Sequence, residues 1–192
     1  MKMNPLSIVI ISVTVIIAIV LYITVWPWLM IFIGSFFLPS PPRPEVTYGE
    51  FPFRLEYEIN GKRKVIQDTL ICEYDGIGID EGRGKYREWK ERLASGNHNI
   101  LLLKVNYMKE IYYYPGSARY YMGDMKEGVT YTQSFPNARY FEKYADGSTR
   151  DGIILADELL TKYNIKLISW DYTPPIKNKF SVTRQCMQTI AP

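Results

Sequence analysis

The sequence predicts an α+β fold: a β-rich globular domain of antiparallel hairpins and two short helices, preceded by one N-terminal transmembrane helix. The first observation behind this prediction is an uncharged apolar run from Leu6 to Leu38. The second is a proline-rich stretch that follows at once. The third is a polar remainder in which apolar residues alternate over strand lengths and end at Asn-Gly, Pro-Gly and Asp-Gly pairs. We therefore expect a membrane anchor at 1–38, a stalk at 39–45 and a β-rich α+β extracytoplasmic domain at 46–192.

The charges of this 192-residue chain are unevenly distributed. It carries 23 Lys and Arg against 20 Asp and Glu, and Lys2 is the one charged side chain among the first forty residues. This distribution excludes a fully soluble protein, a disordered chain and a polytopic transporter. A nearly balanced charge also gives no reason to expect nucleic acid as a partner.

The apolar run is long enough for one membrane span and too short for two, because a bilayer core of about 30 Å takes about 20 helical residues. Asn4-Pro5 predicts the helix start, with Asn4 as the N-cap. Two arrangements remain open. In one, the helix spans 6–25, kinks at Trp26-Pro27-Trp28 with both indoles at the membrane interface, and lies shallowly over 29–38. In the other, one tilted helix ends at Gly34 or Ser35.

A cleaved signal peptide is the competing interpretation of the N-terminal segment. A signal peptide has an apolar region of about 7–15 residues that ends in small residues, whereas this run is longer and ends Gly-Ser-Phe-Phe-Leu. We therefore expect an uncleaved anchor whose partner is the lipid bilayer. Basic residues are balanced across the span, so we rely on the usual topology of small anchors. It predicts a single-pass protein of the cell membrane with its C-terminal domain outside.

The stalk prediction depends on prolines at positions 39, 41, 42 and 44. Such a sequence favours polyproline II, a semi-rigid spacer. It would separate the folded domain from the membrane surface.

The first hairpin is the most specific prediction within the polar domain. Residues 51–59 alternate between apolar and polar, and Asn60-Gly61 is typical of a type I′ turn. A two-residue turn places Ile59 opposite Lys62. The inward positions of the returning strand are then Ile66, Asp68, Leu70, Cys72 and Tyr74. Asp68 is the exception among them and needs either a partner or a place near the sheet edge.

The remaining elements follow from periodicity and turn residues. Tyr86, Trp89 and Leu93 recur with helical spacing and predict a helix over 85–94. Residues 100–105 predict a central strand, and Pro115-Gly116 predicts a hairpin that joins 111–114 to 118–122. The later expected elements are a strand at 139–144 ending at Asp146-Gly147, a helix at 153–163 capped by Asp151, a strand at 165–170 and a last strand from 180 to 190.

Catalytic chemistry finds little support in the sequence. His98 is the single histidine, and no spacing of ligands predicts a metal or a cofactor. The glycine-rich stretch from Asp75 to Gly84 is expected to be a flexible loop. Its carboxylates Asp75, Asp80 and Glu81 are candidates for holding a cation or a substrate.

Tyrosines crowd around the second predicted hairpin, where neighbouring residues of a strand point to opposite faces. One interpretation is that they fill a half-buried sheet. The other is a recognition surface that stacks on sugars or anchors a protein partner. The candidate binding residues are Tyr112, Tyr113, Tyr114, Arg119, Tyr120 and Tyr121.

The two cysteines, Cys72 and Cys186, both fall at inward positions of predicted strands. They are either inert core thiols or a disulfide, if the sheet brings them together. A disulfide would favour a location outside the cytosol.

The function we expect is that of a single-pass membrane-anchored protein which presents a non-catalytic binding or accessory domain at the cell envelope. Its partner would be an envelope protein or polymer. The alternative is an enzyme, a membrane-tethered hydrolase that acts on envelope polymer through the carboxylates near the glycine-rich loop.

Overall fold

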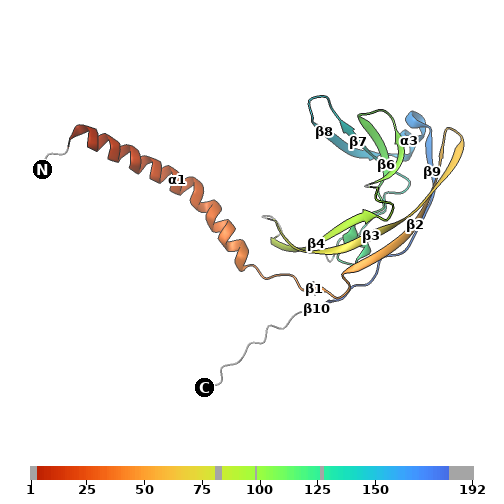
Figure 1. The fold of residues 1–192 in the computed structure, drawn as a ribbon, viewed down its shortest axis with the longest axis horizontal. Coiled ribbons are helices and arrows are strands. Elements are labelled where there is room, and N and C mark those ends of the chain that lie inside the picture. Colours follow the sequence, from red (N-terminus) through yellow and green to blue (C-terminus); the bar gives the residue numbers. More distant parts are fainter. Residues whose placement is uncertain (1–3, 81–83, 98, 126–127, 182–192) are drawn as a thin grey trace, which may run out of the picture. The chain divides into compact units, whose positions relative to one another are not determined.

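The computed structural model describes residues 4–80, 84–97, 99–125 and 128–181. These residues form two compact units. One contains the N-terminal segment to Pro41 together with Ile77–Arg87, and the other contains Pro42–Gly76 and the chain from Glu88 onward. The described part is β-rich, with two antiparallel four-stranded sheets, a short two-stranded pairing and few helices (Figure 1).

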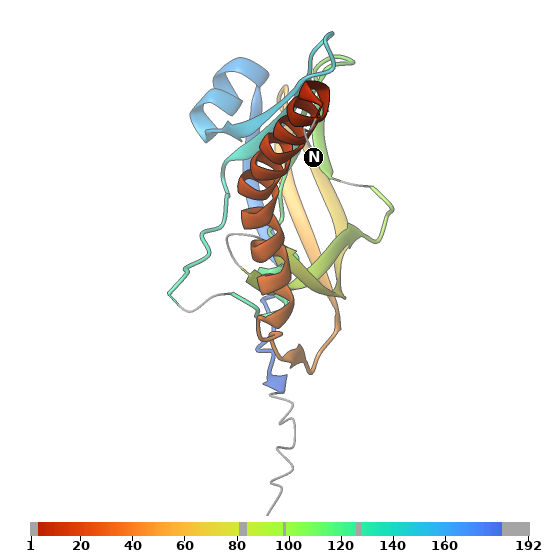
Figure 2. The same ribbon diagram turned by 90° about the vertical axis from the view of Figure 1, so that its left-hand side faces the viewer.

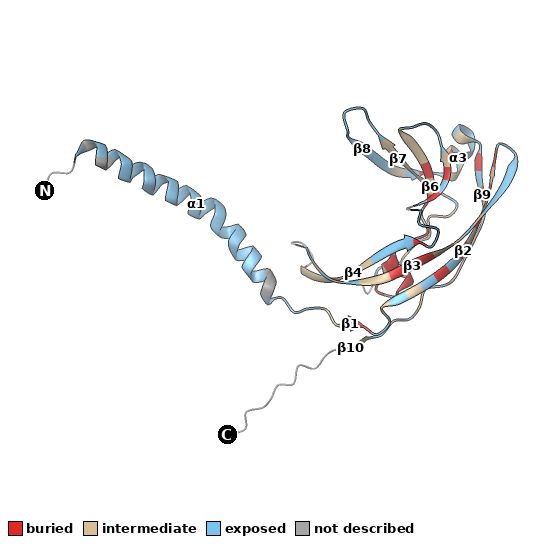
Figure 3. Ribbon diagram, in the orientation of Figure 1, coloured by how far each residue is buried: buried red, intermediate tan, exposed pale blue. Residues whose placement is uncertain are grey.

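The N-terminal segment is one continuous helix, α1, from Pro5 to Phe37, and Pro27 lies inside it. The helix is therefore not divided at Trp26-Pro27-Trp28 into a span and a separate shallow segment. The single-helix arrangement holds, although the helix ends slightly later than predicted. The side-chain oxygen of Asn4 accepts a hydrogen bond from the backbone N–H of Leu6 at 3.3 Å, which confirms the predicted cap. Every residue of α1 whose burial is described is exposed (Figure 3).

The first sheet has the strand order β4-β3-β2-β9, and β2 and β3 lie side by side along their length (Figure 2). Its strands are β2 (Tyr48–Ile59), β3 (Lys62–Asp80), β4 (Gly84–Leu93) and β9 (Ile165–Tyr172). The predicted hairpin is confirmed in register, because Ile59 pairs with Lys62. Asn60 and Gly61 both have positive φ, as a type I′ turn requires.

Asp68, the inward carboxylate of β3, is satisfied by hydrogen bonds. Its oxygens accept from the hydroxyl and the backbone N–H of Ser95, at 2.5 and 3.2 Å, and from the N–H of Thr69. Of the two possibilities expected for Asp68, the structure therefore shows a partner, Ser95.

Two expectations about the region 75–94 are wrong. The glycine-rich stretch continues strand β3 to Asp80 instead of forming a flexible loop. The helix expected over 85–94 is strand β4. The aromatic ring of Tyr86 explains the glycine at position 78, because a Cβ there would stand 2.5 Å from that ring. A cross-strand aromatic over a glycine is a known way to fill a sheet position without a side chain.

The second sheet has the order β5-β6-β7-β8. Its strands are β5 (Ile100–Lys104), β6 (Lys109–Tyr113), β7 (Ala138–Lys143) and β8 (Thr149–Ile154). The predicted strands at 100–105 and 139–144 are confirmed, and so is the turn at Asp146-Gly147. However, β5 lies at an edge of its sheet and not at the centre. β6 pairs with β5 and β7, so the hairpin expected around Pro115-Gly116 is wrong.

Residues 118–121, expected as a strand, form the short helix α2 (Ala118–Tyr121). The side chain of Ser117 caps this helix by accepting from the N–H of Tyr120. Helix α3 (Ala156–Tyr163) confirms the predicted helix but starts later, because Asp151 belongs to β8. The side-chain oxygen of Asn137 accepts from the Ala156 N–H at 3.0 Å at its start.

The predicted stalk contains strand β1 (Arg43–Pro44), which pairs with β10 (Phe180–Ser181). The second compact unit accordingly begins at Pro42. Most of the predicted last strand, including Cys186, lies outside the described residues.

The core of the second unit lies between the two sheets (Figure 3). The inward side chains of β2, which alternate as predicted, meet inward side chains of β5, β6, β9 and helix α3. Leu55, Ile111, Tyr113, Leu159 and Ile165 are each fully buried.

Candidate functional site

The structure divides the predicted tyrosine surface into two groups. Tyr113 and Tyr121 are core residues, with exposed fractions of 0% and 1%. Tyr112, Tyr114, Arg119 and Tyr120 are half-buried. Most of these side chains are therefore partly or fully buried, as in the interpretation that they fill a half-buried sheet.

Two aromatic residues that were not predicted from the sequence, Tyr131 and Tyr172, contact Tyr120 and Tyr121. The Tyr120 ring stacks on Tyr131 with centroids 4.0 Å apart, and its hydroxyl lies 3.4 Å from that of Tyr172. Burial and this contact with Tyr172 raise the pKa of Tyr120 to about 12. The Tyr121 hydroxyl donates to the carbonyl oxygen of Pro115 at 2.9 Å. The cluster therefore packs the irregular segment around α2 against the end of β9.

Glu91, on the inward side of β4, carries a raised pKa. Although the residue as a whole is exposed, its carboxylate lies against the start of α2, where one oxygen accepts from the Ala118 N–H at 2.7 Å. The other oxygen accepts from the Tyr114 hydroxyl at 3.3 Å. Burial raises the pKa of Glu91, and these two hydrogen bonds oppose the rise. The adjoining hollow has a volume of only about 40 Å³, room for about one water molecule.

Glu91 should make the stability of the domain depend on pH. Its folded pKa lies above its unfolded value, so its contribution is fully present below the unfolded pKa, about 4.3, and is lost as pH rises through the folded pKa. As the pH rises from the unfolded pKa through the folded pKa of Glu91, the free energy of unfolding should therefore fall less in Glu91→Gln than in the unaltered protein. Urea unfolding at a series of pH values measures this difference. Parallel curves for the two proteins would contradict the assignment.

The predicted carboxylate site is not gathered in one place. Asp75 lies on β3 and forms an ion pair with Lys90 at 2.7 Å. Asp80 is the last residue of β3, and Glu81 lies outside the described residues, as does His98. Five residues of extended strand cover roughly 16 Å, more than the roughly 5–10 Å between a pair of glycosidase carboxylates. Within the described ranges, no group of three or more His, Cys, Asp or Glu side chains is placed to hold a metal ion.

Cys72 is fully buried. Its burial, and to a smaller extent the negative charge of Glu91, raises the pKa of the thiol to about 12. Such a thiol is chemically inert. Its predicted pairing with Cys186 concerns a residue outside the described part of the chain.

The outward face of the first sheet is covered by ion pairs. Arg54 contacts Glu56 at 2.8 Å and Asp171 at 3.5 Å, and Arg63 also contacts Glu56. Arg92 pairs with Glu73 further along the same face. A wide, open groove of about 800 Å³ crosses β3, β2 and β9. Its outward lining is Arg54, Gln67, Thr69, Asp171 and Thr173. A surface of this kind is typical of a solvated face.

The outward face of the second sheet has a different character. The strand register places Leu101, Tyr112, Arg139 and Ile153 in one row across all four strands. Leu101 is 45% exposed, Ile153 is 62% exposed, and Phe141, one outward position along β7 from Arg139, is 38% exposed. The guanidinium of Arg139 pairs with Asp151 at 2.9 Å. We call Leu101, Tyr112, Phe141 and Ile153 the apolar face.

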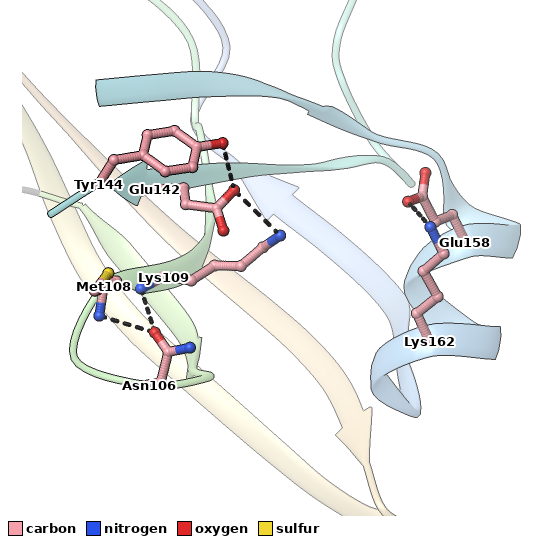
Figure 4. Close-up of polar contacts among 7 residues, drawn as sticks. All are labelled: Asn106, Met108, Lys109, Glu142, Tyr144, Glu158 and Lys162. Carbon is pink, nitrogen blue, oxygen red and sulfur yellow. Dashed lines mark hydrogen bonds and ion pairs between the residues drawn. The ribbon is translucent and has the colours of Figure 1, made fainter. Parts of the chain in front are cut away.

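A polar cluster lies at the far end of this sheet and has its charges matched (Figure 4). Lys109 pairs with Glu142 at 3.6 Å and lies over the ring of Tyr140, while the Tyr144 hydroxyl donates to Glu142. Burial lowers the pKa of Lys109, but a hydrogen bond with Tyr163 and the charge of Glu142 more than offset this, so the pKa is raised. Asn106 stabilises the adjoining turn by accepting from two backbone N–H groups. These contacts describe a structural cluster.

No protein-family model, curated protein sequence or solved structure matches the chain.

Proposed function

We propose that the chain is a single-pass membrane-anchored protein whose β-rich domain acts by binding a protein partner at the cell envelope. The anchor is α1, in which Val9–Gly34 is long and apolar enough to cross a membrane, by length and composition. The apolar stretch is longer than the core of a signal peptide, which supports retention after membrane insertion. We place the C-terminal domain outside the membrane, as small N-terminal anchors usually do.

The observation that carries the binding proposal is the contrast between the two outward faces. The first sheet carries several ion pairs, whereas the second exposes aliphatic and aromatic side chains that surround the Arg139–Asp151 ion pair and border the Lys104–Glu110 pair. Interface cores are depleted in charged residues and enriched in aromatic residues and arginine. The apolar face therefore fits a protein partner better than a sugar chain. A sugar chain would instead suit a flat polar groove.

The apolar face is also the position from which the partner would gain most of its binding energy. Aliphatic and aromatic side chains at the centre of an interface become fully desolvated when the partner docks. Arg139 already pairs with Asp151, so it can contact a partner without being left as an unpaired buried charge.

Two exposed positions on the apolar face allow a direct test. Leu101→Lys with Ile153→Lys should weaken partner binding about tenfold or more, because the two lysines place a charge at each end of the apolar face. The measurement is partner retention when the tagged full chain is purified from its own membranes in mild detergent.

Val65→Lys is the matched control for these two changes. Val65 is 48% exposed on the outward face of the first sheet, where it lies opposite Glu56. The control should retain the partner. Equal retention by the double variant and the control would contradict the assignment of the apolar face.

The alternative of a membrane-tethered hydrolase has one observation in its favour, the raised pKa of Glu91. Both oxygens of that carboxylate already accept hydrogen bonds from Ala118 and Tyr114, and the hollow beside it is too small for a sugar ring. We therefore favour the binding function.

A further inference from the structure

We propose that the end of β3, from Ile77 to Asp80, and the start of β4, from Gly84 to Arg87, lie on the membrane surface and place Ile77 and Ile79 among the lipids. This inference depends on the proposed anchoring by α1. It adds a second membrane contact, made by a strand pair that lies far from the anchor in sequence.

The first observation is the exposure of two isoleucines on one strand. Ile77 is 44% exposed and Ile79 is 50% exposed, with Gly78 between them. The ring of Tyr86 covers Gly78, so the glycine position is filled from the returning strand while the isoleucines stay outside. Exposed β-branched side chains at the end of a hairpin are costly in water and favourable in an apolar environment.

The second observation is the place of this tip in the fold. Ile77–Arg87 belongs to the same compact unit as α1. Within that unit, a hollow of about 580 Å³ is lined mainly by apolar residues of the N-terminal segment, among them Trp28, Phe32 and Leu38, and by Ile79, Asp80 and Gly84 of the hairpin. Tryptophan near the end of a membrane span lies at the headgroup level. The hairpin residues that share the hollow therefore lie at that level too.

The occupant that fits these side chains is the lipid surface. Lipid contact requires apolar side chains at the tip and tolerates basic residues close by, because anionic headgroups attract them. Lys85 and Arg87 lie on the returning strand, close to the two isoleucines in the hairpin. A protein partner would remain an outcome of the test if the tip is protected but not in contact with lipid.

The test uses the full chain in vesicles of phosphatidylcholine and phosphatidylglycerol with brominated acyl chains. A single cysteine is introduced by Ile77→Cys or Ile79→Cys in a Cys186→Ser background and labelled with an environment-sensitive fluorophore. The unsubstituted background protein gives the signal of the buried Cys72, which is subtracted. We expect blue-shifted emission and strong quenching by the brominated lipid at both positions.

Two further labelled positions make the result decisive. Val65→Cys reports a residue of similar exposure on the same strand β3, and its quenching should be several-fold weaker. Ile19→Cys, inside α1, should be quenched strongly. Strong quenching at 19 with equal, weak quenching at 77, 79 and 65 would overturn the hairpin contact. Protection of 77 and 79 from aqueous quencher without lipid quenching would overturn it in favour of a protein contact. Weak quenching at 19 would instead overturn the anchor itself.

Discussion

Replacing Ile16, Ile19 and Ile23 together with lysine is expected to move the protein from the membrane fraction to the soluble or degraded fraction. All three positions lie within Val9–Gly34, the part of α1 that can span a membrane. Each lysine near the middle of a span costs about 3 kcal/mol on insertion scales, so the three together cost roughly 9 kcal/mol. Resistance to alkaline carbonate extraction measures the effect.

Leucine at the same three positions is the control, because it keeps the helix apolar and is a better helix former than isoleucine. This variant should remain in the membrane fraction. If the lysine variant also resisted extraction, α1 would not be what holds the protein in the membrane.

Leu55→Ala should strongly destabilise the β-rich domain. Leu55 is fully buried on β2, which pairs with β3 on one side and β9 on the other. Its neighbours are held by strand pairing, so the vacated space cannot easily close, and the expected loss is about 2–5 kcal/mol of unfolding free energy. Urea unfolding of the full chain in detergent gives this value.

Val65→Ala removes a side chain from the same hairpin at an exposed position and serves as the reference. Its effect should stay within about 0.5 kcal/mol. Similar losses for the two variants would mean that the core does not lie between the two sheets.

The β2–β3 hairpin could be predicted down to its register because two local signals agree. The apolar residues of 51–59 alternate with period two, and Asn60-Gly61 fixes the turn. The single helix α1 could likewise be predicted from composition, whereas its passage through Pro27 was one of two arrangements that the sequence left open. Proline removes one backbone hydrogen bond from the helix. The other residues of a long apolar helix keep their hydrogen bonds, so the helix continues.

Strand β4 shows why other elements were mispredicted. Tyr86, Trp89 and Leu93 have helical spacing, yet Trp89 and Leu93 also share the inward face of a strand with Glu91. These residues form a strand because they pair with the long edge of β3. That pairing is a tertiary contact, which the local sequence pattern does not reveal. Lys90 and Arg92 on the opposite face pair across the sheet with Asp75 and Glu73.

The candidate site could be predicted only in part. Tyr112 was named from the sequence, but its neighbours on the apolar face come from β5, β7 and β8 and are brought together by strand register. Glu91 was missed because the expected helix placed it among solvated charges. Its raised pKa arises from burial of the carboxylate against the start of α2, a tertiary contact that no local pattern encodes.

We expect α1 to remain attached to the folded domain and to hold it in the membrane. Mass spectrometry of the protein extracted from membranes with detergent, after a carbonate wash, measures whether it does. We expect an intact chain of 22.4 kDa in the washed membranes. A shorter chain that begins after the apolar run and is released by carbonate would contradict it and identify a cleaved signal peptide.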